Sequence, residues 1–314
     1  MKTGTISIVG VGSVGAAIAY ATMIRGLGRR IVLVDKNHTK ARGEALDLGH
    51  CSPFVPVVEV EAAPLDAIVG SDVVVVTAGA KQKPGQSRRD LVETNVNLFR
   101  ELIPQIIEKA PDAWLLIVSN PVDALTYAAL RFSRLPPTQV AGTGTVLDTA
   151  RFRHLIGRRI NVSPSSVHAY VVGEHGDSEI GLFSGAMVGG VPLPEFEVDG
   201  QQRLTDSDRA DILEATRKAA GEIIAAKGAT NWAIGLTTAR ILEAYLRDEN
   251  AVLTVSRLLE NYVGRGDVCM SVPSIVSRQG VGPALSVAMS EAEATGLQKS
   301  AETIRGVIER AGLR

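Results

Sequence analysis

The sequence predicts an α/β protein in which a doubly wound parallel sheet domain is followed by a smaller α+β domain. Through the first half, short β-branched runs alternate with longer amphipathic stretches, as in the βαβ units of a parallel sheet. After about residue 145 the strand-like runs become shorter and rich in glycine. The chain has 314 residues, which is more than one typical domain. We therefore expect two domains, residues 1–145 and residues 146–314.

The individual elements follow from the apolar runs and the breaks between them. Four consecutive valines at 73–76 are typical of a strand that is buried on both faces, and residues 115–118 repeat that signal. Pro136-Pro137 marks a break. Along the first half we expect strand 5–9, helix 12–27, strand 31–34, helix 38–48, strand 73–76 and strand 115–118. Right-handed crossovers between these strands would give a doubly wound sheet. In the second half we expect short strands within 181–191 and helices at 207–226 and 291–311.

The composition argues against several classes of function. With 33 basic and 34 acidic side chains, a net charge of -1 and 4% aromatic residues, neither nucleic acid nor an acidic membrane is an expected partner. Cys51 and Cys269 form no CxxC pattern, which predicts free thiols in a reducing compartment and no metal site. The N-terminus has no signal-peptide pattern, and no apolar run reaches the roughly 18 residues of a membrane span. We expect a cytoplasmic protein.

A glycine-rich turn predicts a dinucleotide site. Gly10, Gly12 and Gly15 form a GxGxxG sequence between the first expected strand and the first expected helix. In a Rossmann fold such glycines allow the tight turn, the approach of a pyrophosphate and the packing of helix on sheet, and the helix N-terminus faces the phosphates. Asp35 ends the second strand, where a carboxylate accepts hydrogen bonds from ribose hydroxyls and repels a 2′-phosphate. NAD is the expected cofactor, and a flavin nucleotide is the main alternative.

Three polar segments could carry acid–base chemistry or could be ordinary surface. His175 lies in the glycine-flanked GEHGD, and imidazole is the natural proton donor and acceptor near neutral pH. Asp148 and Arg151 share a face of an expected helix, either as a local ion pair or as a histidine partner and a carboxylate clamp. Arg88 follows a polar loop that leaves the valine strand, and this loop is either plain solvated surface or a lid over a reacting carbonyl.

Five motifs in order along most of the chain resemble those of the L-lactate/malate dehydrogenase superfamily: GVGSVG, AGAKQKPGQSR, SNPVD, LDTARFR and GEHGD. The resemblance implies an NAD-dependent 2-hydroxy acid dehydrogenase whose second domain is the catalytic one. It implies that His175 exchanges the hydroxyl proton and that Asp148 stabilises the imidazolium. It also implies that Arg151 clamps the substrate carboxylate and that Arg88 polarises the carbonyl.

The same resemblance implies further contacts with substrate and cofactor. Asn120, in SNPVD, helps to position the carbonyl and the nicotinamide, and Thr230 lines the substrate pocket. Ile234 lies near the nicotinamide ring. The other implied cofactor contacts are Val14, Gly79, Ala80 and Thr143.

Gln82 distinguishes between the two activities of this family. Malate dehydrogenases carry an arginine at the matching lid position, where it pairs with the second carboxylate of oxaloacetate. An uncompensated carboxylate in a closing pocket costs on the order of several kcal/mol, so Gln82 favours pyruvate and lactate. Lys81 and Lys83 flank Gln82, and malate dehydrogenase activity or activity on another 2-hydroxy acid is the alternative.

Regulation and assembly are further expectations from the resemblance. Arg153 and His168 match positions that bind fructose 1,6-bisphosphate across a subunit interface in bacterial members of the family, although both residues could also be ordinary surface. The family implies a homotetramer. Two other classes are less compatible with the sequence. The complete catalytic set argues against a non-catalytic nucleotide-binding protein, and the Tyr-x-x-x-Lys pair of a short-chain dehydrogenase is absent from the sequence. The segment 262–277 receives no functional assignment.

Overall fold

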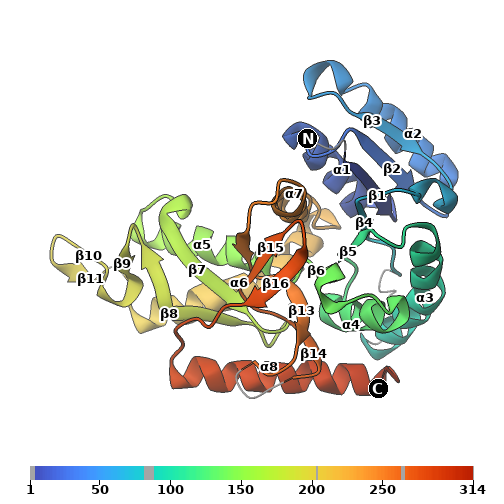
Figure 1. Cartoon of the computed structure of the whole chain (residues 1–314). Coiled ribbons are helices and arrows are strands. Elements are labelled where there is room, and N and C mark those ends of the chain that lie inside the picture. Colours follow the sequence, from blue (N-terminus) through green and yellow to red (C-terminus); the bar gives the residue numbers. More distant parts are fainter. Residues whose placement is uncertain (1–3, 81–87, 203, 263–265, 314) are drawn as a thin grey trace.

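The structure is a computed structural model that describes residues 4–80, 88–202, 204–262 and 266–313, apart from the side chains of residues 88, 89 and 202. Figure 1 shows a large sheet with helices on both of its faces, and a second group of strands and helices beside it. The strands of the large sheet are β1 (Thr5–Val9), β2 (Arg30–Val34), β3 (Glu59–Ala62), β4 (Val73–Val76), β5 (Trp114–Ile117), β6 (Val140–Gly142), β13 (Ser256–Leu259) and β14 (Val268–Ser271).

The large sheet confirms the predicted doubly wound arrangement. Its eight strands lie in the order β14-β13-β6-β5-β4-β1-β2-β3. The strands from β6 to β3 are parallel to one another. The direction in which the chain winds reverses between β1 and β4, and open α/β sheets bind ligands at the carboxyl ends of strands beside such a reversal.

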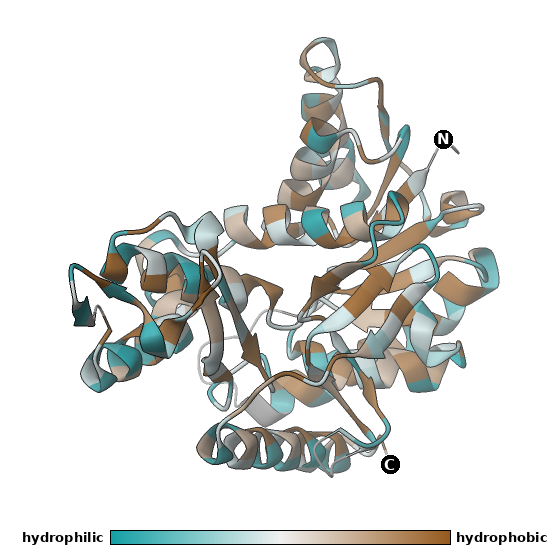
Figure 2. Cartoon of the chain, turned by 60° about the vertical axis from the view of Figure 1, so that its left-hand side comes forward, coloured by the Kyte–Doolittle hydropathy of each residue, from teal (hydrophilic) through white to brown (hydrophobic). Residues whose placement is uncertain are grey.

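The valine strand β4 is buried on both faces because different helices cover each face. Val75 packs in one apolar cluster with Ile18 of α1 (Ser13–Arg25), on the face that also carries α2 (His38–Gly49). Val76 packs in a second cluster with Phe99 of α3 (Arg88–Lys109), on the face that also carries α4 (Val122–Ser133). Since successive residues of a strand point to opposite faces, an unbroken valine run serves both clusters. The hydropathy colouring in Figure 2 agrees, with mostly brown strands in the large sheet.

The second half forms a smaller group of elements with its own apolar core. Helix α5 (Val146–Ile160) packs against β7 (Val167–Val172), which pairs antiparallel with β8 (Ile180–Val188). Phe152 of α5 and Val171 of β7 belong to this core. The remaining elements are β9 (Val191–Pro192), β10 (Glu197–Val198), β11 (Gln201–Gln202), α6 (Asp206–Lys227), α7 (Trp232–Leu246), β12 (Ala251–Leu253), β15 (Ser274–Ser277), β16 (Gly280–Ala284) and α8 (Glu291–Arg310). Helices α6 and α8 confirm the two long helices expected there.

The segment 262–277, which has no functional assignment from the sequence, contains β14 and β15. Strand β13 pairs antiparallel with β14 and meets β6 at Ser256 and Gly142, so it extends the parallel sheet by two strands from the second half of the chain. Gly173, just after β7, exchanges backbone hydrogen bonds with Ser271 at the end of β14. The segment thus connects the large sheet to the loop that carries His175. Among the described helices, none combines the length and the apolar character that crossing a bilayer requires.

Candidate active site

Two adjoining cavities meet at His175, beyond the carboxyl end of β5. The larger measures about 730 Å³ and is lined by Asn120, Asp123 and residues of α3 and α8. The smaller measures about 500 Å³ and is lined by Asp148, Arg151 and residues of α6. His175 lines both cavities, so its imidazole lies between the turn that follows β5 and the helix that carries Asp148 and Arg151.

The glycine-rich turn has the backbone that a bound pyrophosphate requires. Gly10 has φ +103°, and a Cβ there would lie 2.5 Å from the backbone nitrogen of Ala78. A Cβ on Gly15 would lie 2.1 Å from the carbonyl oxygen of Gly10, so α1 can approach the turn only with glycine at this position. Gly12 caps α1 without a side-chain hydrogen bond, which leaves the first N–H groups of the helix for an anion.

Asp35 is placed to bind a ribose beside this turn. Its carboxylate accepts hydrogen bonds from the backbone N–H of Val11 at 2.6 Å and of Asn37 at 2.8 Å. The ammonium of Lys40 bonds to the carbonyl oxygen of Val11. Each carboxylate oxygen has two acceptor sites, so Asp35 retains capacity for the hydroxyls of an adenine ribose. Together with the turn, these residues fit NAD.

A buried asparagine joins the end of the valine strand to the turn that holds Asn120. The Asn95 side chain of α3 accepts the backbone N–H of Ala80 at 2.7 Å and donates to the Asn120 carbonyl oxygen at 2.9 Å. Only 1% of Asn95 is exposed, so its amide is shielded from water, although Ala80 and Asn120 are themselves exposed. Gly79 packs against Asn95 and Ser119. Sequence reasoning missed Asn95, because a polar residue on an amphipathic helix is more often part of its solvated face.

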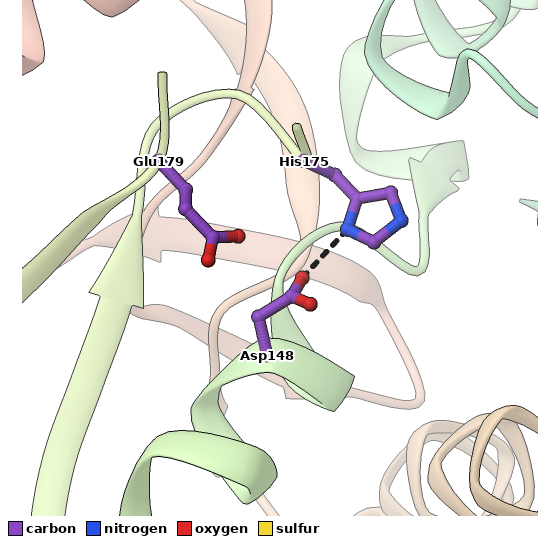
Figure 3. A group of neighbouring side chains, drawn as sticks. All are labelled: Asp148, His175 and Glu179. Carbon is purple, nitrogen blue, oxygen red and sulfur yellow. Dashed lines mark hydrogen bonds and ion pairs between the residues drawn. The ribbon is translucent and has the colours of Figure 1, made fainter. Parts of the chain in front are cut away.

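The structure brings His175, Asp148 and Arg151 together. His175 Nδ1 and Asp148 Oδ2 lie 2.6 Å apart (Figure 3). Asp148 Oδ1 accepts a hydrogen bond from Arg151 Nη1 at 2.7 Å. Asp148 is in the first turn of α5 and 2% exposed, whereas 24% of the His175 side chain is exposed. The local ion pair with Arg151 and the partnership with His175 are alternatives from the sequence, and in the structure Asp148 makes both contacts.

The pKa values of His175 and Asp148 are shifted in opposite directions. Burial by itself would lower the pKa of His175, but the charge and hydrogen bond of Asp148, followed by the charges of Asp123 and Glu179, raise it to about 9. Burial would raise the pKa of Asp148, but His175 and Arg151 outweigh it and hold this pKa below its ordinary value. At neutral pH the site therefore favours an imidazolium against a carboxylate, and this imidazolium can donate a proton.

Glu179 is a further acidic residue beside Asp148 and His175, and sequence reasoning missed it. It follows His175 by four residues, is 2% exposed and extends toward Asp148 and His175 (Figure 3). Burial and the Asp148 charge raise the pKa of Glu179 to about 8, so this carboxyl is mostly protonated at neutral pH. One atom from each of the three residues lies within 4.8 Å of the others. Because the charge of Asp148 is already paired with the cationic side chains of Arg151 and protonated His175, we interpret the group as acid–base machinery instead of a metal site.

The other expected site residues are dispersed around this centre. Val14 is half-buried in α1, and Thr143 is buried at the end of β6, where its N–H donates to the Ile117 carbonyl. Thr230 and Ile234 are half-buried at the junction of α6 and α7, outside the residues that line the two cavities. Gln82 lies outside the described residues, as does the side chain of Arg88, the first residue of α3.

The two residues expected to bind a sugar bisphosphate lie on neighbouring elements. Arg153 of α5 donates from Nε to the carbonyl oxygen of Ala169 at 2.9 Å, and its guanidinium carbon lies 5.5 Å from the centre of the Tyr170 ring. Burial lowers the pKa of Arg153. His168, beside Ala169 on β7, is exposed.

Comparison with known proteins finds the same two-part organisation. The model of the lactate/malate dehydrogenase NAD binding domain matches residues 4–142, and that of the lactate/malate dehydrogenase alpha/beta C-terminal domain matches residues 145–312. An L-lactate dehydrogenase of Synechococcus sp. (strain JA-3-3Ab) is 46% identical over 303 residues, which cover 96% of this chain and 98% of that protein. An L-lactate dehydrogenase of Clostridium botulinum (strain Hall) is 44% identical over 310 residues, which cover 99% and 98%.

Solved structures agree with the sequence comparison. The minor L-lactate dehydrogenase from Enterococcus mundtii, in a ligands-bound form, superposes with a TM-score of 0.95 at 39% identity and 98% coverage of both chains. A lactate dehydrogenase from a Medee basin deep-sea metagenome superposes with a TM-score of 0.95 at 35% identity, covering 99% of this chain and 100% of that one. The Rossmann sheet, the dinucleotide turn and both family matches agree: this chain belongs to the lactate/malate dehydrogenase family of NAD-dependent oxidoreductases.

Proposed function

We propose that this protein is an L-lactate dehydrogenase, which interconverts pyruvate and L-lactate with NAD as cofactor. The 2.6 Å contact between His175 Nδ1 and Asp148 Oδ2 carries the proposal, because it holds an imidazole ready to exchange a proton where the two cavities meet. The relatives named L-lactate dehydrogenase, which align over nearly the whole chain, support the choice of substrate. Malate dehydrogenase activity is not favoured.

Three residues are assigned to proton transfer and to binding of the substrate carboxylate. When bound, the reduced cofactor supplies the hydride. Protonated His175 donates its Nε2 proton to the pyruvate oxygen as that oxygen gains negative charge, and neutral His175 accepts the hydroxyl proton of lactate in reverse. Asp148 stabilises the imidazolium. Arg151 uses Nη1 on Asp148, and its other N–H groups hold the substrate carboxylate in this proposal.

The remaining roles are part of the same proposal. Arg88 polarises the carbonyl, Asn120 positions it, and Thr230 lines the pocket around the methyl group. Cofactor contacts are assigned to the backbone of the glycine turn, to the ribose carboxylate and to a set around the nicotinamide: Gly10, Gly12, Val14, Gly15, Asp35, Gly79, Ala80, Asn120, Thr143 and Ile234. Residues 1–145 form the dinucleotide-binding domain and residues 146–314 the catalytic domain.

The substrate assignment predicts a strong preference for pyruvate over oxaloacetate. We expect kcat/KM for pyruvate, measured as NADH oxidation, to exceed that for oxaloacetate by at least about 100-fold, as expected when nothing compensates a second carboxylate. The variant Gln82→Arg should narrow or reverse this ratio, with Gln86→Arg as a control at another glutamine of the same loop. A wild-type preference for oxaloacetate would refute the proposal and point to Lys81 or Lys83 as the compensating charge.

Activation by fructose 1,6-bisphosphate stays a prediction, as do the homotetramer and the cytoplasmic location. The exposed position of His168 and the neighbouring Arg153 are compatible with a phosphate ligand. If this ligand binds there, pyruvate titrations should show a lower KM in its presence, and the variant His168→Gln should lose most of the response. Glucose 6-phosphate serves as the control ligand. Superimposable titrations with and without the bisphosphate would remove the prediction.

A further inference from the structure

A second buried carboxylate holds the backbone of His175. Asp123 lies in the first turn of α4 and is 4% exposed. Its Oδ2 accepts the backbone N–H of His175 at 2.8 Å, and its Oδ1 accepts the hydroxyl of Ser256 at 2.6 Å. Ser256 is fully buried on β13. One side chain therefore ties together α4, the loop after β7 and a strand of the large sheet.

Asp123 also belongs to the turn that carries Asn120. The Asn120 side chain accepts the N–H of Val122 at 3.2 Å, and the Asn120 carbonyl accepts the Asn95 amide at 2.9 Å. Hydrogen bonds therefore lead from Ala80, at the cofactor side, through Asn95 and the Asn120 turn to the backbone of His175. Asn95 and Asp123 are buried whereas Asn120 is exposed, so the two buried side chains hold the Asn120 turn at a fixed distance from His175.

The charge of Asp123 acts on the same imidazole. Burial raises the pKa of Asp123 to about 6, against the hydrogen bonds from Ser256 and the His175 backbone and the charge of His175, which lower it. Asp123 is thus ionised at neutral pH, and its charge raises the pKa of His175. Among the described residues, the other titratable and charged groups around this pair are Asp148 and Arg151 of α5, Glu174, Asp177 and Glu179 of the loop, Arg217, Lys218 and Glu222 of α6, Cys269 of β14, Glu93 of α3 and Arg310 of α8.

We propose that Asp123 is a positioning residue for proton transfer, which fixes the backbone of His175 relative to Asn120 and favours the protonated imidazole. Asp123 touches no reacting atom in this proposal and acts through His175. The proposal rests on the proposed reaction, in which His175 is the proton donor. It separates two functions among the buried carboxylates: Asp148 orients the imidazole ring, and Asp123 orients the backbone that carries it.

The variant Asp123→Asn tests the charge with little change of shape. An asparagine in this place can still accept the His175 N–H through its oxygen and can donate to the Ser256 hydroxyl through its amide. We expect the pKa of His175, read from the basic limb of kcat/KM for pyruvate, to fall by about one unit, a tenfold change in the ratio of protonated to neutral imidazole. NADH affinity should stay within about twofold of wild type, since the dinucleotide turn is untouched. An unchanged basic limb in the folded variant would overturn the proposal.

The variant Ser256→Ala gives a second test that does not depend on how well Asp123→Asn folds. It removes a hydrogen bond that lowers the pKa of Asp123 but keeps the charge. We expect the acidic limb, which lies near pH 6 in the wild type, to move to higher pH, while the basic limb set by His175 stays in place. A merely structural role would lower the thermal midpoint and leave both limbs unmoved, and this outcome too would overturn the proposal.

The test can be kept separate from the substrate assignment. The pKa of the His175 imidazole can be measured by NMR titration without turnover, and its signal is assigned among the five histidines by comparison with His175→Gln. If the wild type fails to reduce pyruvate but Asp123→Asn still shifts this pKa, the proposed function fails and the Asp123–His175 coupling stands. If pyruvate is reduced and the pKa does not shift, only the role of Asp123 fails.

Discussion

Replacing His175 with glutamine should lower kcat for pyruvate reduction by about 10³-fold or more and leave NADH binding almost unchanged. General acid catalysis by one side chain contributes about 10²- to 10⁴-fold, and the lost imidazolium also stabilises the oxygen that becomes negative. Glutamine keeps polar bulk in the cavity but has no proton to exchange near neutral pH. The measurement is a pyruvate titration at saturating NADH, with cofactor affinity followed separately by NADH fluorescence.

The matched control is His154→Gln. His154 is exposed on α5, the same helix that carries Asp148, so its substitution removes an imidazole from the neighbourhood without touching either cavity. We expect its kcat and KM to stay within about twofold of wild type, as for a surface substitution. If His175→Gln retains more than about a tenth of wild-type turnover, the proton donor is another group, and Glu179 would be the first to examine because it is protonated at neutral pH.

The second large effect is expected from Asp148→Asn, in both rate and pH dependence. The variant removes the largest influence that raises the pKa of His175, so burial should then dominate and the pKa should fall from about 9 toward or below its ordinary value. Pyruvate reduction needs protonated His175, so in the wild type its kcat/KM should be level between the acidic limb near pH 6 and about pH 9, and should decline above pH 9. In Asp148→Asn this decline should begin at lower pH, with kcat reduced by about 10²-fold at neutral pH.

The rate of lactate oxidation should have the opposite pH dependence. The reaction requires neutral His175, so the wild-type rate should rise as the pH approaches about 9, and the variant should reach its plateau at lower pH. Asp206→Asn is the control, since this carboxylate is almost fully exposed on α6, where it pairs with Arg209. Coincident pH profiles for Asp148→Asn and wild type would show that Asp148 does not set the charge of His175.

The raised pKa of His175 also makes folding stability depend on pH. Because the pKa of His175 is raised above its unfolded value near 6.5, the protonated form contributes stability that is complete below about pH 6.5 and is lost as the pH rises through about 9. Asp148→Asn should remove most of this dependence. Thermal midpoints measured at pH 6 and pH 9 would therefore differ less in the variant than in the wild type.

The sequence by itself determined the local features that depend on interactions within a few residues. The GxGxxG turn needs glycine because a Cβ on Gly10 or Gly15 would collide with backbone, and such a need is visible as a motif. Asp148 and Arg151 were predicted to share a helix face, and they do. The valine run predicted a strand buried on both faces, since only a fully covered strand can carry an unbroken apolar pattern.

Only the tertiary structure decided which distant polar residues surround His175. Asp123, Asn95 and Glu179 are each polar residues that a sequence pattern cannot distinguish from surface, because their burial depends on contacts with segments far away along the chain. Asp123 reaches His175 over 52 positions and Ser256 over 133. Likewise, β13 and β14 extend the parallel sheet through pairing with a strand more than a hundred residues earlier. Burial raises the pKa values of Asp123 and Glu179, and burial is a property of the folded chain.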